Sequence, residues 1–243
     1  VRPLIASSLY KKGYTLLQEN AYPEAEEKFK QAVSYRPKKG WFYRYAEAYR
    51  DHKQHRRAAE MYQRTLRYFK QDKKAGLDYA TMELEDYEDY AEAERIVLRE
   101  VLDFHINDSD GMLLLGDIYL EWGTEKDPEK LEEAREQYTR LQELYNKPDL
   151  YQSRMMRYYI RNDSLYEVLQ CKNQFYPRKK SLGGEDWTEL SGYLLDKLYG
   201  TLKPNEVYLR ESIEDVRDLL ERAIAFSPNS PVAHYNMGRY FVN

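Results

Sequence analysis

The sequence repeats itself along most of its length, and this repetition constrains the fold more than any other feature. The small residue Gly13 is followed by Ala25, Phe29, Ala32 and Pro37. All or part of this spacing returns in three further places: Ala46, Ala58, Tyr62, Thr65 and Lys70; Thr81, Ala93, Val97, Glu100 and His105; Val216, Leu220, Ala223 and Pro228. A period of about 34 residues predicts an array of stacked units rather than one continuous core.

Each unit reads as a pair of antiparallel helices. Small residues allow the two helices to approach closely, while steps of three and four residues keep apolar groups on one helical face. We call the central residue of each first helix its anchor, and the anchors are Gly13, Ala46, Thr81, Gly116, Met156, Ser191 and Gly238. The corresponding units cover residues 6–38, 39–73, 74–108, 109–148, 149–183 and 184–230, with a partial unit at 231–243.

This pattern resembles the tetratricopeptide repeat, and the stretch "WTELSGYLL" from Trp187 is an especially good match to the first helix of that family. The resemblance implies an all-α, right-handed α-solenoid of helical hairpins, with six repeats and one extra terminal helix in a single domain. Insertions lengthen the fourth unit at "TEKDPE" and the sixth around "YGTLKPNEVYLRES". The fifth unit lacks small residues, so its register could be off by one.

Composition agrees with a helical repeat protein. Charged residues make up 33% and apolar residues 42%, with only 11 Gly and 9 Pro, which is typical of a helix-rich protein that is not disordered. The 25 tyrosines suit thin layers in which side chains lie half inside a core. No apolar run is long enough to span a bilayer, and the single cysteine, Cys171, excludes an internal disulfide.

No motif predicts catalysis, a cofactor or a metal. His52 and His55 lie three residues apart, but the neighbouring Lys and Arg repel a cation, so exposed histidines in a turn are the better interpretation. "NDSDG" from Asn107 lacks the first carboxylate of a calcium loop and is read as a turn with a helix cap. "LGGED" from Leu182 lacks the lysine of a phosphate loop, and Cys171 has no histidine nearby in the sequence.

Charge is distributed unevenly along the chain. Residues 36–74 contain 13 Lys and Arg against 4 Asp and Glu, whereas residues 78–149 contain 7 against 22. Regions of opposite sign can steer a complementary protein or allow copies to associate head to tail; the alternative is that these charges only solvate outer faces. Nucleic acid is not the expected partner, because the aromatic residues in the basic segment fall at core spacing and the acidic block repels phosphates.

The resemblance also implies where a partner would bind, since in this family the first helices line the concave groove. The expected groove residues are Tyr10, Tyr14, Tyr43, Glu47, Arg50, Asp78, Met82, Glu85, Leu113, Asp117, Tyr235 and Arg239. Each of these tyrosines could instead pack between adjacent units, and the sequence favours neither packing nor partner binding. One branch of the family clamps chaperone carboxylates with Lys and Asn, but Tyr10, Tyr14 and Glu47 occupy the corresponding positions here, which disfavours that function.

The sequence therefore predicts a non-catalytic scaffold that binds a protein partner, within a multiprotein assembly. Two alternatives stay open: the recognition module of an enzyme whose catalytic domain lies elsewhere, and a cytoplasmic peptide-binding adaptor. The tyrosine-rich repeats also resemble bacterial envelope proteins of the family, including those of the spirochaetal flagellar motor collar, which implies the periplasm. Because the sequence starts at Val1 without an initiator Met, and an unfinished unit carrying Tyr235 and Phe241 closes it, we expect a longer parent protein.

Overall fold

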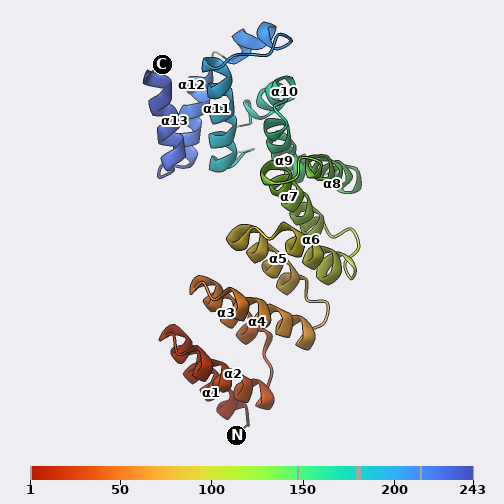
Figure 1. The fold of residues 1–243 in the computed structure, drawn as a ribbon, viewed down its shortest axis with the longest axis vertical. Helices are drawn as coiled ribbons and strands as arrows, with labels where there is room; N and C mark the ends of the chain where they lie inside the picture. The colour runs from red at the N-terminus through yellow and green to blue at the C-terminus, as the bar shows by residue number, and fades with distance from the viewer. Residues whose placement is uncertain (1, 147, 179–181, 214, 243) are drawn as a thin grey trace. The chain divides into compact units, whose positions relative to one another are not determined.

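The fold is all-helical. The computed structural model describes residues 2–146, 148–178, 182–213 and 215–242, and in these ranges every regular element is a helix (Figure 1). The first helices of the successive hairpins are α1 (Arg2–Gln18), α3 (Lys39–Asp51), α5 (Lys73–Tyr87), α7 (Ser109–Glu125), α9 (Pro148–Arg161), α11 (Gly184–Tyr199) and α13 (Pro231–Val242). The second helices are α2 (Tyr22–Tyr35), α4 (His55–Tyr68), α6 (Tyr90–Ile96) continued by the π-helix η1 (Val97–Leu102), α8 (Lys130–Tyr145), α10 (Leu165–Phe175) and α12 (Val216–Phe226).

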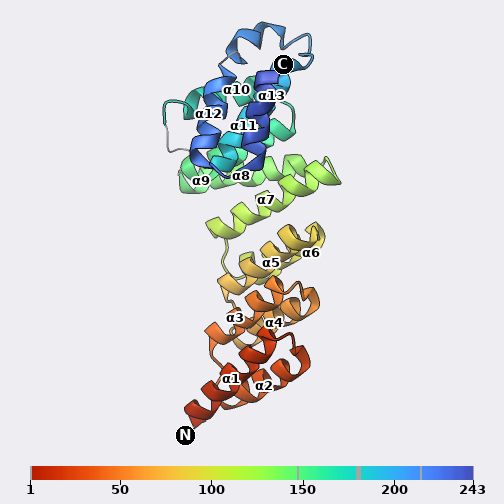
Figure 2. The same ribbon diagram turned by 90° about the vertical axis from the view of Figure 1, so that its left-hand side faces the viewer.

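These helices pair in sequence order, as an α-solenoid of hairpins requires. α1 packs on α2, α3 on α4, α5 on α6 and α11 on α12, and both views show the hairpins as adjacent helix pairs (Figures 1 and 2). The chain divides into two compact units, and the boundary between them falls between Ile118 and Tyr119, within α7. The predicted fold class is confirmed.

The two helices of the first hairpin approach closely at Gly13. A Cβ atom on this residue would lie 2.9 Å from Lys28 Cβ, 3.0 Å from the Ala25 carbonyl oxygen and 2.3 Å from Tyr45 Oη of the next repeat. In the second hairpin Ala46 and Ala58 have no exposed surface. The small residues of the repeat pattern therefore lie where helices touch.

The turn between the two helices of a hairpin also recurs. Asn20, Lys53 and Asp163 each adopt a positive φ at the end of a first helix. In each case the next N–H closes the turn by donating to a carbonyl five residues earlier: Ala21 N to Leu16 O at 2.8 Å, Gln54 N to Tyr49 O at 2.8 Å and Ser164 N to Tyr159 O at 2.9 Å. This left-handed cap ends a helix by satisfying its last carbonyl groups. The cap lies seven residues after Gly13, Ala46 and Met156 and is closed by the same five-residue hydrogen bond, and these two features together support the register chosen for the fifth repeat.

The third repeat departs from the predicted register by one residue. Its left-handed cap is Glu88, and the hydrogen bond that closes the turn runs from Asp89 N to Glu83 O at 3.0 Å. This bond spans six residues of the chain, whereas the corresponding bonds of the other turns span five. The first helix accordingly buries Ala80 with no exposed surface, whereas the expected anchor Thr81 is half-buried. The buried acid Glu83 takes the place that the prediction gave to Leu84.

The second helix of this repeat also contains an extra residue. After Val97 the fully buried side chain is Val101, while Glu100, expected at a core position, is half-buried. The π-helix η1 accommodates this residue, because its hydrogen bonds span five residues instead of the four of an α-helix. Spacing alone therefore placed Thr81, Leu84 and Glu100 wrongly.

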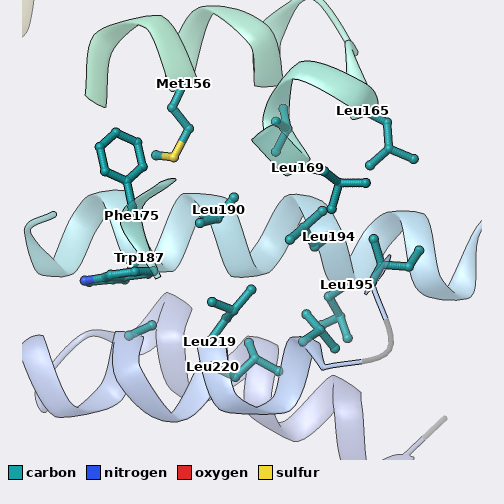
Figure 3. Close-up of a cluster of buried hydrophobic side chains, with 14 of the residues drawn as sticks. Met156, Leu165, Leu169, Phe175, Trp187, Leu190, Leu194, Leu195, Leu219 and Leu220 are labelled. Carbon is teal, nitrogen blue, oxygen red and sulfur yellow. The ribbon is translucent and has the colours of Figure 1, made fainter. Parts of the chain in front are cut away.

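The core of the second unit is formed mainly by α9 to α12. Met156 of α9, Leu165 and Leu169 of α10, Trp187 and Leu190 of α11 and Leu219 and Leu220 of α12 meet in one buried cluster (Figure 3). Each fully buried leucine contributes about 1.5–3 kcal/mol relative to exposure. In α13 only Ala233 and Asn236 are buried, and the expected anchor Gly238 faces open space because no helix packs on it among the described residues.

The insertion in the sixth repeat is ordered rather than loose. It contains the short helix η2 (Val207–Ile213), whose Leu209 and Ile213 are buried. The buried Lys172 of α10 donates to the Ser212 carbonyl at 2.7 Å and to Asp215 at 2.5 Å. These bonds hold the insertion against the preceding repeat.

The close approach at Gly13 predicts a stability difference between two glycine substitutions. Gly13→Ala places a methyl group against Ala25, Lys28 and Tyr45, and we expect it to destabilise the first unit by about 1–3 kcal/mol. Gly40→Ala is the matched control, because a Cβ atom at this position meets nothing within 4 Å. Alanine also favours a helix over glycine, so this variant should be no less stable than the wild type. Urea unfolding of both variants measures the difference, and a neutral Gly13→Ala would contradict the close approach.

Burial of Glu83 predicts a pH dependence of stability. Burial raises the pKa of the Glu83 carboxyl, although a hydrogen bond from His55 opposes the shift. The folded chain then holds this proton more tightly than the unfolded chain, so its stability falls as pH rises from the unfolded pKa through the folded pKa. Glu83→Gln imitates the neutral acid and should exceed wild type in free energy of unfolding at neutral pH, with the gap closing below the unfolded pKa. Urea titrations across pH test this, with the exposed Glu47→Gln as control; a less stable Glu83→Gln at neutral pH would contradict it.

Candidate protein-interaction surface

The predicted groove residues fall into three groups. Tyr10 and Met82 are buried. The half-buried residues are Tyr14, Tyr43, Arg50, Asp78, Leu113, Asp117 and Arg239, and the exposed residues are Glu47, Glu85 and Tyr235. Ten of the twelve predicted side chains are thus at least partly exposed on the first helices.

Tyr10 and Met82 are corrections to the predicted surface. Tyr10 belongs to the buried stripe of α1 formed with Ala6, Gly13 and Leu17, and its ring stacks on Trp41 of α3 with centroids 4.6 Å apart. Packing between adjacent repeats is thus the role of this tyrosine. Met82 is fully buried, as the one-residue register difference of the third repeat explains.

In the first unit, Asp72 joins α3 to the start of α5. Its carboxylate accepts the Ala75 N–H at 2.9 Å, lies 2.5 Å from Lys39 Nζ and accepts the Tyr43 hydroxyl. Burial opposes the charge, but these hydrogen bonds outweigh it and hold the pKa of Asp72 below its usual value. Burial and the hydrogen bond to Asp72 raise the pKa of Tyr43. The same hydrogen bond restrains the Tyr43 ring on the first-helix face.

Basic side chains on one first helix pair with acids on the next. Arg50 of α3 contacts Glu85 at 3.0 Å and Asp86 at 3.1 Å, and its hydrogen bonds lower the pKa of Asp86. Lys73 of α5 reaches Asp108 at 2.9 Å and Asp110 at the start of α7 at 3.0 Å. Some basic side chains of residues 36–74 therefore pair with acidic side chains of residues 78–149, and these ion pairs join neighbouring repeats.

The second unit repeats this arrangement. Arg157 of α9 contacts Asp186 at 2.9 Å and Glu189 at 3.4 Å on α11, and Arg161 pairs with Glu189. Arg239 of α13, one of the predicted residues, lies 2.6 Å from Asp196 of α11. First helices in both units are thus linked by ion pairs that leave their outer atoms partly exposed.

A cavity of about 770 Å³ lies on the first-helix face of the second unit. Its wall is formed by residues of α11, of α13, of the turn between α12 and α13, and of the end of α9. The lining residues on these elements include Arg161, Glu185, Thr188, Glu189, Gly192, Asp196, Ser230, Asn236 and Arg239.

Of the two residues predicted on α13, Arg239 is among the residues that line the cavity and Tyr235 is not, and the sequence prediction missed the contribution of α11. Tyr235 and Arg239 lie three residues before and one residue after the anchor Gly238. The same offsets from Ser191 give Thr188 and Gly192, and both line the cavity. The repeat pattern therefore contained the signal. Asn236 carried no such signal, because its position in α13 corresponds to none of the predicted groove positions.

The other sequence motifs have structural roles. His52 approaches Asn20 at 2.9 Å, whereas His55 contacts Glu83 at 2.9 Å, so the two histidines face different repeats. Asp108 caps α7 by accepting the Gly111 N–H at 2.9 Å, as predicted for a turn with a helix cap. Burial raises the pKa of the Cys171 thiol to about 11, which keeps it protonated at neutral pH.

Among the described residues, no group of three or more His, Cys, Asp or Glu side chains is arranged to hold a metal ion. No helix in the same part of the chain is both long and apolar enough to cross a bilayer.

The bonds around Asp72 predict a large difference between two Asp→Asn variants. Asp72→Asn removes the negative charge that pairs with the Lys39 ammonium and accepts the hydrogen bond of the Tyr43 hydroxyl. We expect the free energy of unfolding to fall by about 1–3 kcal/mol. Asp78→Asn is the control, since its ion pair with Lys74 is more exposed and worth about 0–1 kcal/mol. Equal losses in urea unfolding would show that Asp72 does not join α3 to α5.

Comparison with known proteins supports the fold. No family model and no curated protein matches the chain. Among solved structures, the chain is similar to a tetratricopeptide repeat protein from Parabacteroides merdae ATCC 43184, with a TM-score of 0.57 and 14% sequence identity. The match covers 98% of this chain and 99% of that one. The chain therefore has a tetratricopeptide-repeat-like fold.

Proposed function

We infer that the protein is a non-catalytic interaction module that binds a partner protein on the first-helix faces of its repeats, as part of a multiprotein assembly. Arrays of helical repeats characteristically use extended surfaces of this kind for binding. The observation that carries the proposal is the first-helix face of the second unit, where a cavity of about 770 Å³ is bordered by polar and charged side chains from α11 and α13.

The first unit supports the same function with a different surface. Tyr43 is held by Asp72, and Arg50 is held by Glu85 and Asp86, so these side chains are already ordered before a partner arrives. Ordered aromatic and arginine side chains lose little conformational entropy on binding, and they are the types most often found in binding hot spots. The exposed Glu47 lies on the same helix as Tyr43 and Arg50.

The experiment compares two double variants with matched chemistry. Glu47→Lys with Tyr235→Ser changes an exposed glutamate and an exposed tyrosine on first helices. Glu143→Lys with Tyr166→Ser makes the same changes at exposed positions on the second helices α8 and α10. Each chain is used to capture partners from cells of the source organism, and captured proteins are quantified by mass spectrometry.

We expect the first-helix variant to lose a specific partner by about tenfold or more, because truncating a hot-spot side chain and reversing a charge act on the interface itself. The second-helix variant should capture that partner like the wild type. Circular dichroism melts confirm that both variants fold. The proposal fails if the second-helix variant alone loses the partner, or if both variants behave alike.

A further inference from the structure

We propose that a second cavity, formed by α9 with the second helices α8 and α10, binds a small organic cation: an ammonium or guanidinium head on a short alkyl chain. This inference goes beyond the proposed function, because it concerns a different surface and a different kind of ligand. Its basis is an unpaired carboxylate, a wall that contains no cation, and a buried amide oxygen without a hydrogen-bond donor.

This cavity, which we call the α9 cavity, lies within the second unit and has a volume of about 410 Å³. It forms where α9 packs on both α8 and α10. Residues three and four apart on a helix share one face. Gln152, Met155 and Tyr159 of α9 and Glu167 and Cys171 of α10 therefore face the same space, with further glutamines of α8 and α10 around them.

Glu167 supplies a carboxylate without a partner. It is half-buried in the cavity wall and makes no ion pair or hydrogen bond with any described residue. It lies in the first turn of α10, where the partial positive charge of the helix start favours an acid. This position explains why an acid is tolerated there, but it leaves the carboxylate oxygens available to a ligand.

The rest of the wall provides no counter-charge for Glu167. Among the described residues that line the cavity there is no Lys, Arg or His. Burial, with a smaller contribution from the Glu167 charge, raises the pKa of the Cys171 thiol to about 11, so Cys171 stays neutral. The guanidinium of Arg135 acts on the nearby Tyr159, but Glu132 already pairs with it. An uncompensated carboxylate among neutral polar groups favours a cationic ligand.

The Gln152 side chain adds a need for a hydrogen-bond donor. Its carboxamide oxygen is shielded from solvent and accepts no hydrogen bond from the described residues. Buried acceptors are almost always paired, and an unpaired one is destabilising. Ammonium and guanidinium groups carry several N–H donors and no acceptor. A rotation of this half-buried side chain toward the cavity gives the oxygen such a donor.

The remaining wall suits an alkyl chain. The Met155 thioether and the rings of Tyr151 and Tyr159 line the cavity. A thioether adapts its shape to an alkyl chain, and aromatic rings attract a cation placed over their faces. At the ~30 Å³ that one water takes up in the liquid, the volume holds about ten to fifteen non-hydrogen atoms. This is the size of a short diamine or of a guanidino-amine.

Calorimetric titration of the full chain tests the ligand class. 1,5-Diaminopentane and agmatine carry cationic heads, whereas 1,5-pentanediol and glutarate keep the carbon chain of the diamine with neutral or anionic ends. We expect the two cations to bind with a Kd below about 1 mM, more weakly as salt rises, and the diol and glutarate to bind at least about tenfold more weakly.

A lysine with blocked amino and carboxyl ends distinguishes the two sources of such a head. If it binds more tightly than the diamine, the ligand is a side chain of a protein. If it binds more weakly, the ligand is a free amine.

Two variants separate the charge from the amide. Glu167→Gln should weaken diamine binding by about tenfold or more. Glu211→Gln is the matched control, because Glu211 is exposed on η2 and does not line the cavity, and it should bind like the wild type. Gln152→Met should weaken binding by about threefold or more without lowering the urea midpoint, since it removes an acceptor that the folded chain leaves unpaired. A purely structural Gln152 would lose stability instead.

Methyl resonances of the wild-type chain locate the ligand independently of any variant. With ¹³C-labelled methionine methyl groups, the diamine should shift the Met155 resonance and leave those of Met61 and Met82 in the first unit unchanged. The inference is overturned if no cation binds, if the diol or glutarate binds like the diamine, if Glu167→Gln binds like the wild type, or if Met155 does not respond. These outcomes leave the proposed function standing, because capture of the partner is measured with first-helix variants and without a small cation.

Discussion

The structure depends on the close approach of two helices at a small residue. At Gly13 the distance between α1 and α2 leaves no room for a methyl group, and in the second repeat Ala46 and Ala58 are fully buried. This contact lets a thin layer of two helices form a core, and it directs the larger side chains toward the next repeat. Tyr10 stacking on Trp41 is one result. The outer side of each first helix is then available for polar residues.

Ion pairs between first helices build on this packing. Lys39 binds Asp72, the residue that caps α5, and Arg50 binds Asp86 within α5. Arg157 and Arg239 bind acids of α11. The uneven charge along the sequence is therefore explained in part by stacking. Such pairs also fix the first-helix side chains in position, which lowers the entropic cost of the binding that we propose for this face.

The sequence predicted the fold class and the helical hairpins, because these follow from spacing along a helix. The register predicted for the third repeat was wrong because no residue type in the sequence marks the extra residues near Glu88 and in η1. They are visible only in the structure, in the six-residue span of the hydrogen bond from Asp89 N to Glu83 O and in the burial of Val101. Tyr10 was misassigned because a tyrosine can pack or bind with the same spacing. The cavity could not be predicted, since Gly192 and Asn236 come together only when α11 packs on α13.

The central claim is that the first helices carry the binding surface. Hydrogen–deuterium exchange of the chain with and without its captured partner tests this most directly, because it reports protection helix by helix in the intact protein. The account predicts new protection in α3, α5, α11 and α13. Protection confined to the second helices α2, α4, α10 and α12 would contradict it.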